Sequence, residues 1–267
     1  MRAGILTIGD ELLDGLVLDT NSNWIENRLK ALSIEMHRLV AVRDNMHEIA
    51  EGLEFLLGAC DVIITSGGLG PTHDDMTLGA IASALGLSLV ENKDALAMVE
   101  RQYKMLGEQG IVESSEITEP RKKMAMLPEG SIPLDNTVGG APGVMIELAV
   151  TTIFCLPGVP AELKYVFSSS VEPWLEENAT SKYIERIIEF LWKDESKFAP
   201  HIDTVMSKHE GVYIKSMPRR YGTTDILRVW VSARGSDETL LKELISKTIQ
   251  SLTDEVGQDP SFPRESP

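Results

Sequence analysis

The chain has 267 residues and a formal net charge of -16 at pH 7, and hydrophobic residues make up 43% of it and charged residues 25%. This balance is typical of a folded globular protein and excludes a disordered or collagen-like chain. No apolar run approaches the ~20 residues of a membrane-spanning helix, and the N-terminus lacks a signal-peptide cleavage pattern. We therefore expect a cytoplasmic protein that does not bind membranes.

The negative charge is concentrated in the first two thirds of the chain. Residues 1–180 contain 12 Lys and Arg against 27 Asp and Glu, whereas residues 181–267 contain 13 against 14. Nucleic acids and anionic membranes bind cationic surfaces, so the charge argues against both as partners. Cys60 and Cys155 lie in apolar segments and are expected to be buried, reduced thiols.

Strand and helix patterns alternate in the first part of the chain. Apolar, β-prone segments at 2–8, 36–42 and 61–65 are each followed by apolar residues at helical spacing. Asn45 and Glu48 have the form of a capping box. This βαβ series predicts a parallel sheet with right-handed crossovers.

The pattern becomes mixed from about residue 87. Residues 107–123 are polar and irregular, and the strands expected at 144–148 and 152–156 are close enough to form a hairpin. The other elements expected here are strands at 87–90 and 124–127 and helices at 96–106 and from 161 to 167.

A second, smaller α+β domain is expected after Trp174. The polar segment 176–181 has the composition of a linker. Strands are expected at 183–192, 212–216 and 227–233, and helices at 196–208 and 237–253. The predicted domains are therefore residues 1–174 and 181–255, and residues 256–267, with three prolines, are expected to be a disordered tail.

A glycine-rich segment, TSGGLGPTHDD at residues 65–75, follows the buried strand 61–65. Its three glycines let the backbone approach a ligand and present N–H groups, and the helix that follows adds a dipole that attracts phosphate. The carboxyl end of a strand is also where open α/β sheets bind ligands. The segment is neither a Walker A loop nor a dinucleotide fingerprint. It predicts a site for a phosphorylated, nucleotide- or pterin-like small molecule.

Two acids close this loop, and the sequence leaves their role open. Asp74 and Asp75 are suited to the start of a helix, where Asp75 would form a capping pair with Thr72. They are equally suited to recruit a hard divalent cation beside a phosphate. His73 is the one histidine within the loop, and the other histidines are isolated.

Three further segments are ordinary turns when taken singly. They are residues 9–15 with 19–21, residues 136–143, and residues 156–162. Each precedes or follows an expected strand, so together they are expected to wall the same pocket. The basic segment 215–220 is expected to be a solvated turn rather than a phosphate contact.

Taken together, these motifs resemble the CinA family, specifically its N-terminal domain of the molybdopterin-binding, MoaB/MogA-like superfamily. The resemblance covers roughly residues 1–170 with all motifs in order, and residues 181–255 resemble the family's small KH-like domain. The nicotinamide-nucleotide deamidase domain that is usual in the family has no room in this chain, so its activity is expected to be absent.

The resemblance implies a three-layer α/β fold with a mixed, mostly parallel sheet, a KH-like α+β second domain, and a homo-oligomer. It also implies a pyrophosphatase that acts on ADP-ribose with a divalent metal, Co²⁺ or Mg²⁺, and potassium ions. Other members of the superfamily bind molybdopterin and its adenylate. Ser66 stands where many relatives have threonine, and His73 stands where lysine is common, which removes a cation from the site.

Two functions therefore remain open. The first is metal-dependent hydrolysis of ADP-ribose or a related nucleoside diphosphate, with Asp10, Glu11, Asp74 and Asp75 as catalytic residues and with Glu11, Asp74 and Asp75 on the metal. The second is a protein that binds a pterin or its nucleotide without turnover. RNA binding by the second domain is weak as a hypothesis, because that domain lacks a G-x-x-G loop. The residues expected to contact the ligand are Thr20, Asn21, Ser66, Gly67, Gly68, Gly70, Pro71, Thr72, Gly140, Pro142, Gly143, Pro157 and Gly158.

Overall fold

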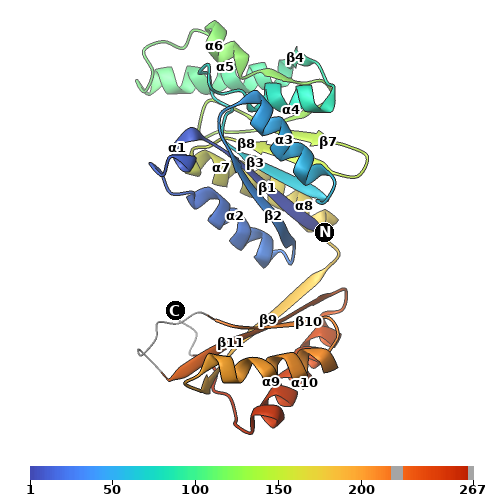
Figure 1. Ribbon diagram of the computed structural model, residues 1–267. Coiled ribbons are helices and arrows are strands. Elements are labelled where there is room, and N and C mark those ends of the chain that lie inside the picture. The colour runs from blue at the N-terminus through green and yellow to red at the C-terminus, as the bar shows by residue number, and fades with distance from the viewer. Residues whose placement is uncertain (218–224, 264–267) are drawn as a thin grey trace. The chain divides into compact units, whose positions relative to one another are not determined.

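The structure is a computed structural model that describes residues 1–217 and 225–263. The chain divides into two compact units, Met1–Ala179 and Thr180–Pro267 (Figure 1). Each unit has its own hydrophobic core and is described by itself. None of the helices in the described residues is long and apolar enough to cross a membrane.

The first unit is built on a six-stranded sheet with the strand order β2-β1-β3-β8-β7-β6. The neighbours from β2 to β8 are parallel, and β7 and β6 are added antiparallel. This confirms the predicted mixed, mostly parallel sheet and the β7–β8 hairpin. The strands are β1 (Arg2–Ile8), β2 (Glu35–Val42), β3 (Val62–Ser66), β6 (Ile132–Leu134), β7 (Gly143–Glu147) and β8 (Thr152–Leu156).

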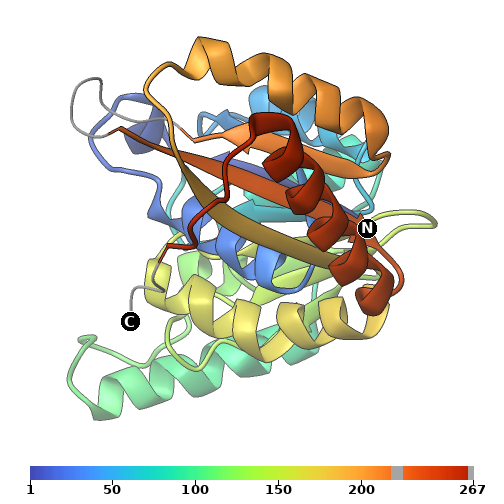
Figure 2. The same ribbon diagram turned by 90° about the horizontal axis from the view of Figure 1, so that it is seen from below.

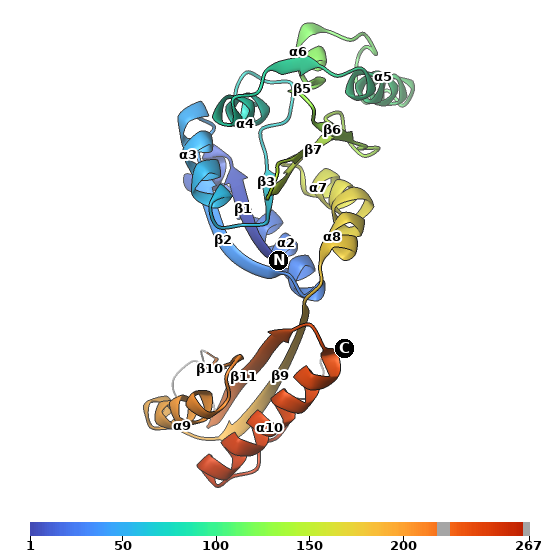
Figure 3. The same ribbon diagram turned by 90° about the vertical axis from the view of Figure 1, so that its right-hand side faces the viewer.

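Helices cover both faces of this sheet and produce three layers. Figure 3 shows α3 on one side of the sheet and α7 and α8 on the other. Every residue of β3 and β8 is buried, which explains their continuous apolar sequence. The first unit also contains α1 (Asp10–Leu13), α2 (Thr20–Ala31), α3 (Met46–Leu57), α4 (Thr77–Leu85), β4 (Leu89–Glu91), α5 (Lys93–Glu108), α6 (Glu119–Lys123), β5 (Met126–Pro128), α7 (Pro160–Val166), a π-helical turn (Phe167–Val171) and α8 (Glu172–Asn178).

Local sequence signals explain several of these boundaries. The Asn45 side chain accepts the backbone N–H groups of His47 and Glu48 at the start of α3, as the capping pattern predicts. Asp19 caps α2 by accepting the N–H group of Ser22. Both cysteines are buried and free, and burial raises the pKa of Cys155 to about 12.

The structure differs from the sequence prediction where elements are short. Asp10–Leu13 and Glu119–Lys123 are helices, although both segments were expected to be irregular, because one turn is too short to show helical periodicity. The expected linker is also wrong in part. Residues 176–178 continue α8, in which Leu175 is buried and these polar residues face solvent.

The second unit is a three-stranded antiparallel sheet with the order β10-β11-β9. Both helices lie on one face of this sheet (Figure 2), which agrees with the predicted α+β domain. Residues 257–263 are not a free tail throughout, because Ser261 forms a β-bridge with Glu189. Residues 218–220 of the basic segment and the tail from 264 lie outside the described residues. The elements are β9 (Lys182–Leu191), α9 (Glu195–Lys208), β10 (Val212–Ser216), β11 (Ile226–Gly235) and α10 (Glu238–Val256).

Candidate functional site

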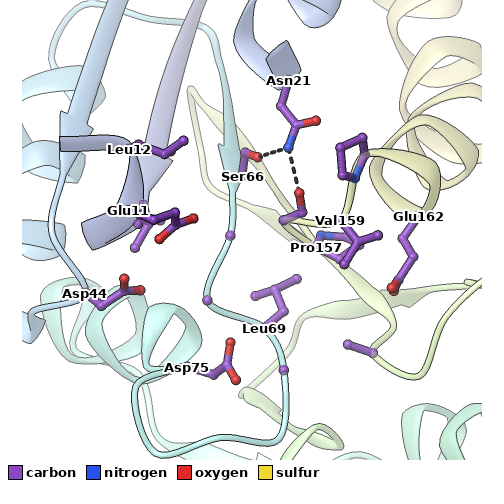
Figure 4. A pocket seen from close by; sticks show the side chains of 18 of the residues that line it. Glu11, Leu12, Asn21, Asp44, Ser66, Leu69, Asp75, Pro157, Val159 and Glu162 are labelled. Atoms are coloured by element: carbon purple, nitrogen blue, oxygen red, sulfur yellow. Dashed lines mark hydrogen bonds between the residues drawn. The ribbon is translucent and has the colours of Figure 1, made fainter. Parts of the chain in front are cut away.

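A cleft of about 590 Å³ lies where the parallel strands of the first unit end. The loops after β1, β3 and β8 meet there, because the carboxyl ends of parallel strands share one edge of the sheet. Figure 4 shows side chains from these loops around the cleft. The predicted site residues that line it are Glu11, Thr20, Asn21, Ser66, Gly67, Gly68, Gly70, Pro71, Asp74, Asp75, Gly140, Pro157 and Gly158.

Two polar residues expected at the site do not line this cleft. The carboxylate of Asp10 pairs with the guanidinium of Arg43 at 3.3 Å, on the outer side of α1. The N–H of Thr72 donates to Asp75 at 2.8 Å, and its hydroxyl is shared between the carboxylates of Asp74 and, at 2.5 Å, Asp75. The Thr72–Asp75 pair therefore exists, but it closes a turn ahead of α4 rather than capping that helix, whose N-cap is Met76.

Pro142 and Gly143 also lie outside the lining, and both are buried. Gly143 is the first residue of β7, and a Cβ atom added there would lie 2.7 Å from Cγ1 of Val166. The physical requirement for glycine at this position is therefore close packing between a strand and α7. The sequence pattern indicated that Pro142 and Gly143 line the pocket. In the structure they are buried outside the pocket lining.

The glycine-rich loop of residues 65–75 contains four consecutive backbone N–H groups, from Gly67 to Gly70, that could face a ligand. The N–H of Gly67 donates to the carbonyl of Leu156 at 3.0 Å, so the expectation that Gly67 holds phosphate in this way is wrong. Among the described residues, no protein acceptor takes the N–H groups of Gly68, Leu69 and Gly70. All three residues line the cleft. Consecutive free N–H donors of this kind are suited to an anion.

Hydrogen bonds fix the shape of this loop. Gly68 has φ +69°, and a Cβ atom there would lie 2.1 Å from Oγ1 of Thr77. The Thr77 hydroxyl donates to the carbonyl of Gly67 at 2.9 Å, and the Thr77 N–H donates to that of Gly68. The carbonyl groups are therefore turned toward α4, which leaves the following N–H groups without intramolecular partners.

Asn21 joins three segments of the cleft wall. Its Nδ2 atom donates to Oγ of Ser66 at 3.1 Å and to the carbonyl of Gly158 at 2.8 Å (Figure 4). A Cβ atom at Gly158 would lie 3.3 Å from Cα of Gly67, so the loops after β3 and β8 are in close contact. The start of α2 and these two loops thus form one connected wall.

Acidic side chains gather on another side of the cleft. Asp44, at the end of β2, lines it together with Glu11 and Asp74, and sequence reasoning missed this residue. The pKa of Asp44 is raised, chiefly by burial and further by the charges of Asp10, Glu11 and Asp74, although the N–H of Asp10 opposes this by donating to it. An acid two residues after the expected strand 36–42 was the signal available in the sequence.

These acids do not by themselves form a metal site. Within residues 1–217 and 225–263, no group of three or more His, Cys, Asp or Glu side chains is arranged to hold a metal ion. Carboxylate oxygens are the donor type that Mg²⁺ prefers, but a cation here would depend on additional oxygens from a ligand. The hydroxyl of Thr72 is the main cause of the lowered pKa of Asp74, which favours its ionised form.

A cation reaches the glycine loop from a distant part of the chain. The ammonium group of Lys123, at the end of α6, donates to the carbonyl of Thr72. The side chain of His73 is 98% exposed and does not line the cleft. Lys123 thus holds the loop at Thr72 from outside the cleft lining, a contact that sequence reasoning could not associate with the loop.

Glu162, near the start of α7, lines the cleft as expected for segment 156–162, although it was not named among the individual ligand contacts. Burial raises its pKa, and a hydrogen bond from the side chain of Asn136 opposes that shift. Tyr103 of α5 lines the same cleft. These residues come from three separate elements, so only the folded chain brings them together.

Comparisons with known proteins agree with this architecture. The model of the family described as "Probable molybdopterin binding domain" matches residues 4–177. A protein from Aeropyrum pernix is 40% identical over 94% of this chain and 91% of its own length, and one from Pyrobaculum aerophilum is 37% identical over 94% and 92%. The solved structure of CinA, of unknown function, from Thermoplasma acidophilum is 33% identical, covers 64% of this chain and 96% of its own, and has a TM-score of 0.59. The chain therefore belongs to the molybdopterin-binding-domain family, and within it the chain is similar to CinA.

Proposed function

We propose that the cleft binds a phosphorylated heterocyclic small molecule, a molybdopterin-like pterin phosphate or its nucleotide, without turnover. The observation that carries this proposal is the run of available N–H groups from Gly68 to Gly70 in the cleft wall. Three donors on adjacent residues suit phosphate oxygens, and the start of α4 adds a favourable dipole. The family description, which names molybdopterin, supports a pterin-type ligand.

The charge distribution supports the same placement of the ligand. Glu11 and Asp44 repel an anion, so phosphate is favoured at the N–H groups of Gly68 and Leu69 and not beside these acids. The carboxylate of Asp75 packs against Gly70, since a Cβ atom there would lie 2.6 Å from Oδ2 of Asp75. The cleft volume of about 590 Å³ lies within the range of small-molecule sites.

Thermal unfolding with added ligand tests the proposal directly. A ligand that binds the folded state alone raises the melting temperature Tm, by an amount that grows with its concentration. We expect 6-hydroxymethylpterin phosphate to raise Tm, and the unphosphorylated pterin to raise it less. If no phosphorylated pterin or nucleotide raises Tm at millimolar concentration, the proposal is wrong.

Hydrolysis of ADP-ribose is a second candidate function. The observation that favours it is the gathering of Glu11, Asp44 and Asp74 on one side of the cleft, where a divalent cation would offset the repulsion between these carboxylates. In this candidate Glu11, Asp44, Asp74 and Asp75 line the cleft while Asp10 lies outside it, and Co²⁺ or Mg²⁺, with K⁺, accompanies the substrate. AMP release from ADP-ribose in the presence of these ions, lost in Asp74→Ala, is the expected result. Absence of AMP release would remove this candidate and leave the binding proposal intact.

The homo-oligomer implied by the family resemblance stays a prediction. Sedimentation velocity of the purified chain is expected to give a species larger than the monomer at micromolar concentration. A single monomeric species over that range would contradict it. This measurement does not depend on the identity of the ligand.

A further inference from the structure

We infer that Glu162 recognises the heterocycle of the bound ligand by accepting a hydrogen bond from an exocyclic amino group of that heterocycle. The inference rests on the proposed function, because it requires a phosphorylated heterocycle in this cleft. It specifies the ligand class further, as an amino-substituted nitrogen heterocycle. Glu162 becomes a specificity-determining residue under this inference, with no part in any bond-making step.

Asn136 fixes the carboxylate of Glu162 in one arrangement. Its Nδ2 atom donates to the carbonyl of Ala141 and to Oε2 of Glu162, both at 2.7 Å. Its Oδ1 atom accepts the N–H groups of Val138 and Gly139, at 3.1 and 3.0 Å. The amide, 3% exposed, thus uses both donors and both acceptor positions. Rotating it would turn its NH₂ group toward two N–H donors, so Asn136 must present a donor to Glu162.

One carboxylate oxygen of Glu162 is then left for a ligand. Among the described residues, Oε1 has no hydrogen-bond partner, while the side chain extends along the cleft beside Val159 (Figure 4). The loop from 136 to 141 lies close against this carboxylate, since a Cβ atom at Gly139 would lie within 2 Å of it. A partly buried carboxylate with one free oxygen favours a ligand that donates a hydrogen bond.

The surroundings of Glu162 suit a planar ring. Tyr103, Met124, Ala141 and Val159 line the same cleft as Glu162. The guanidinium of Arg121 lies 4.0 Å from the centre of the Tyr103 ring, which orients that ring. A Cβ atom at position 140 would lie 3.1 Å from Tyr103, so glycine there allows close approach of the loop. Apolar and aromatic walls with one hydrogen-bond acceptor match an amino-substituted heterocycle.

The variant Glu162→Gln tests this geometry because it must invert the hydrogen bond. Asn136 can only donate, so the carbonyl of the introduced glutamine is required to face it, and the NH₂ group of that glutamine faces the cleft. An acceptor thereby becomes a donor with little change in shape. The probes are 6-hydroxymethylpterin phosphate and 6-hydroxymethyllumazine phosphate, which differ at position 2 by an amino against an oxo group, together with ADP-ribose and its hypoxanthine analogue.

We expect the unmodified protein to bind the amino member of each pair about tenfold or more tightly, the factor that one hydrogen bond to a charged group provides. Glu162→Gln is expected to prefer the oxo member, and Glu162→Ala to show neither preference. Glu176→Gln, on the exposed side of α8, is the matched control and should retain the original preference. Calorimetric titration gives the dissociation constants, and thermal unfolding confirms that each variant is folded.

The possible outcomes separate the two proposals. Binding of the phosphorylated probes without discrimination within each pair overturns the role of Glu162 and leaves the proposed function standing. Equal weakening of both members by Glu162→Gln overturns it too, because that result reports only a lost charge. Binding of no probe by the unmodified protein overturns both. Inversion of preference in Glu162→Gln alone is the result that supports the inference.

Discussion

At the scale of single residues, Gly68 shows how the loop depends on backbone conformation. It has φ +69°, and a Cβ atom there meets Oγ1 of Thr77 at 2.1 Å. Gly86 has a matching φ of +67°, but nothing lies within 4 Å of a Cβ atom at that position. A side chain at Gly86 would meet only the energetic cost of the left-handed conformation. A side chain at Gly68 would meet that cost and a steric clash as well.

Gly68→Ala is expected to lower the free energy of unfolding by about 2–4 kcal/mol and to abolish binding of the pterin phosphate. Gly86→Ala is expected to lower it by only about 1 kcal/mol and to leave binding unchanged. Urea denaturation and calorimetric titration measure the two effects. Equal destabilisation by both variants, with binding retained in Gly68→Ala, would mean that Thr77 does not hold the loop in the binding conformation.

Asp44 connects the acidic side of the cleft to the stability of the protein. Its pKa in the folded state is raised above the ordinary value of 3.8, mainly by burial. Above that value the unfolded chain releases the proton first, so the folded state loses stability as pH rises through the raised pKa. The penalty is absent below about 3.8 and grows as pH rises above that value.

Asp44→Asn removes this penalty and keeps an acceptor for the N–H of Asp10, which lies 3.0 Å from the carboxylate. We expect Tm to rise by roughly 1–2 °C at pH 7, because a partly exposed carboxyl contributes less than about 1 kcal/mol. The difference should shrink as pH falls toward 4. Thermal unfolding of both proteins across this pH range is the test, and a difference that grows on acidification would contradict the assignment.

At the scale of elements, the short helix α6 has no helical periodicity in its sequence, yet it places Lys123 against the glycine-rich loop. Its five residues bring Lys123 to the carbonyl of Thr72, across 51 positions of sequence. Long, periodic elements such as α3 and α10 were expected from the sequence because their apolar residues repeat over several turns. Short elements depend on tertiary contacts, and α1, α6 and β6 were missed for that reason.

Lys123→Met keeps most of the side-chain stem but removes the charge and the hydrogen bond to the loop. We expect it to weaken binding of the pterin phosphate by about threefold to tenfold, the loss typical of one such contact. Lys122→Met is the control, because Lys122 pairs with Glu91 at 2.9 Å, away from the loop. Binding constants at low salt decide the matter, and equal losses in both variants would indicate general electrostatics instead.

At the scale of the whole molecule, each unit has a core of its own. In the first unit two apolar clusters lie on opposite faces of the six-stranded sheet, and a third cluster lies within the second unit. Every residue that lines the cleft belongs to the first unit. The binding chemistry proposed here is therefore complete within residues 1–179.

A fragment of residues 1–179 is expected to fold and to bind the pterin phosphate with a dissociation constant within about twofold of that of the full chain. The physical reason is that its core and its cleft are both contained within it. Circular dichroism and calorimetric titration of the fragment test this expectation. A folded fragment that does not bind would show that the second unit contributes to the site.

The sequence by itself determined the arrangement of layers and the place of the ligand loop. Alternating apolar periods specify strands and helices locally, and a glycine run after a buried strand predicts an anion site wherever that strand lies in the sheet. The hairpin from β7 to β8, the α+β second unit and the buried cysteines followed from the same local patterns.

Only the tertiary structure decided which groups of that loop are free and what surrounds them. The N–H of Gly67 donates to the carbonyl of Leu156, and the ammonium group of Lys123 donates to the carbonyl of Thr72. The amide of Asn136 fixes Glu162 across 26 positions. Hydrogen bonds form between groups that are close in the folded chain, and the periodic pattern of apolar residues does not show which distant residues become close.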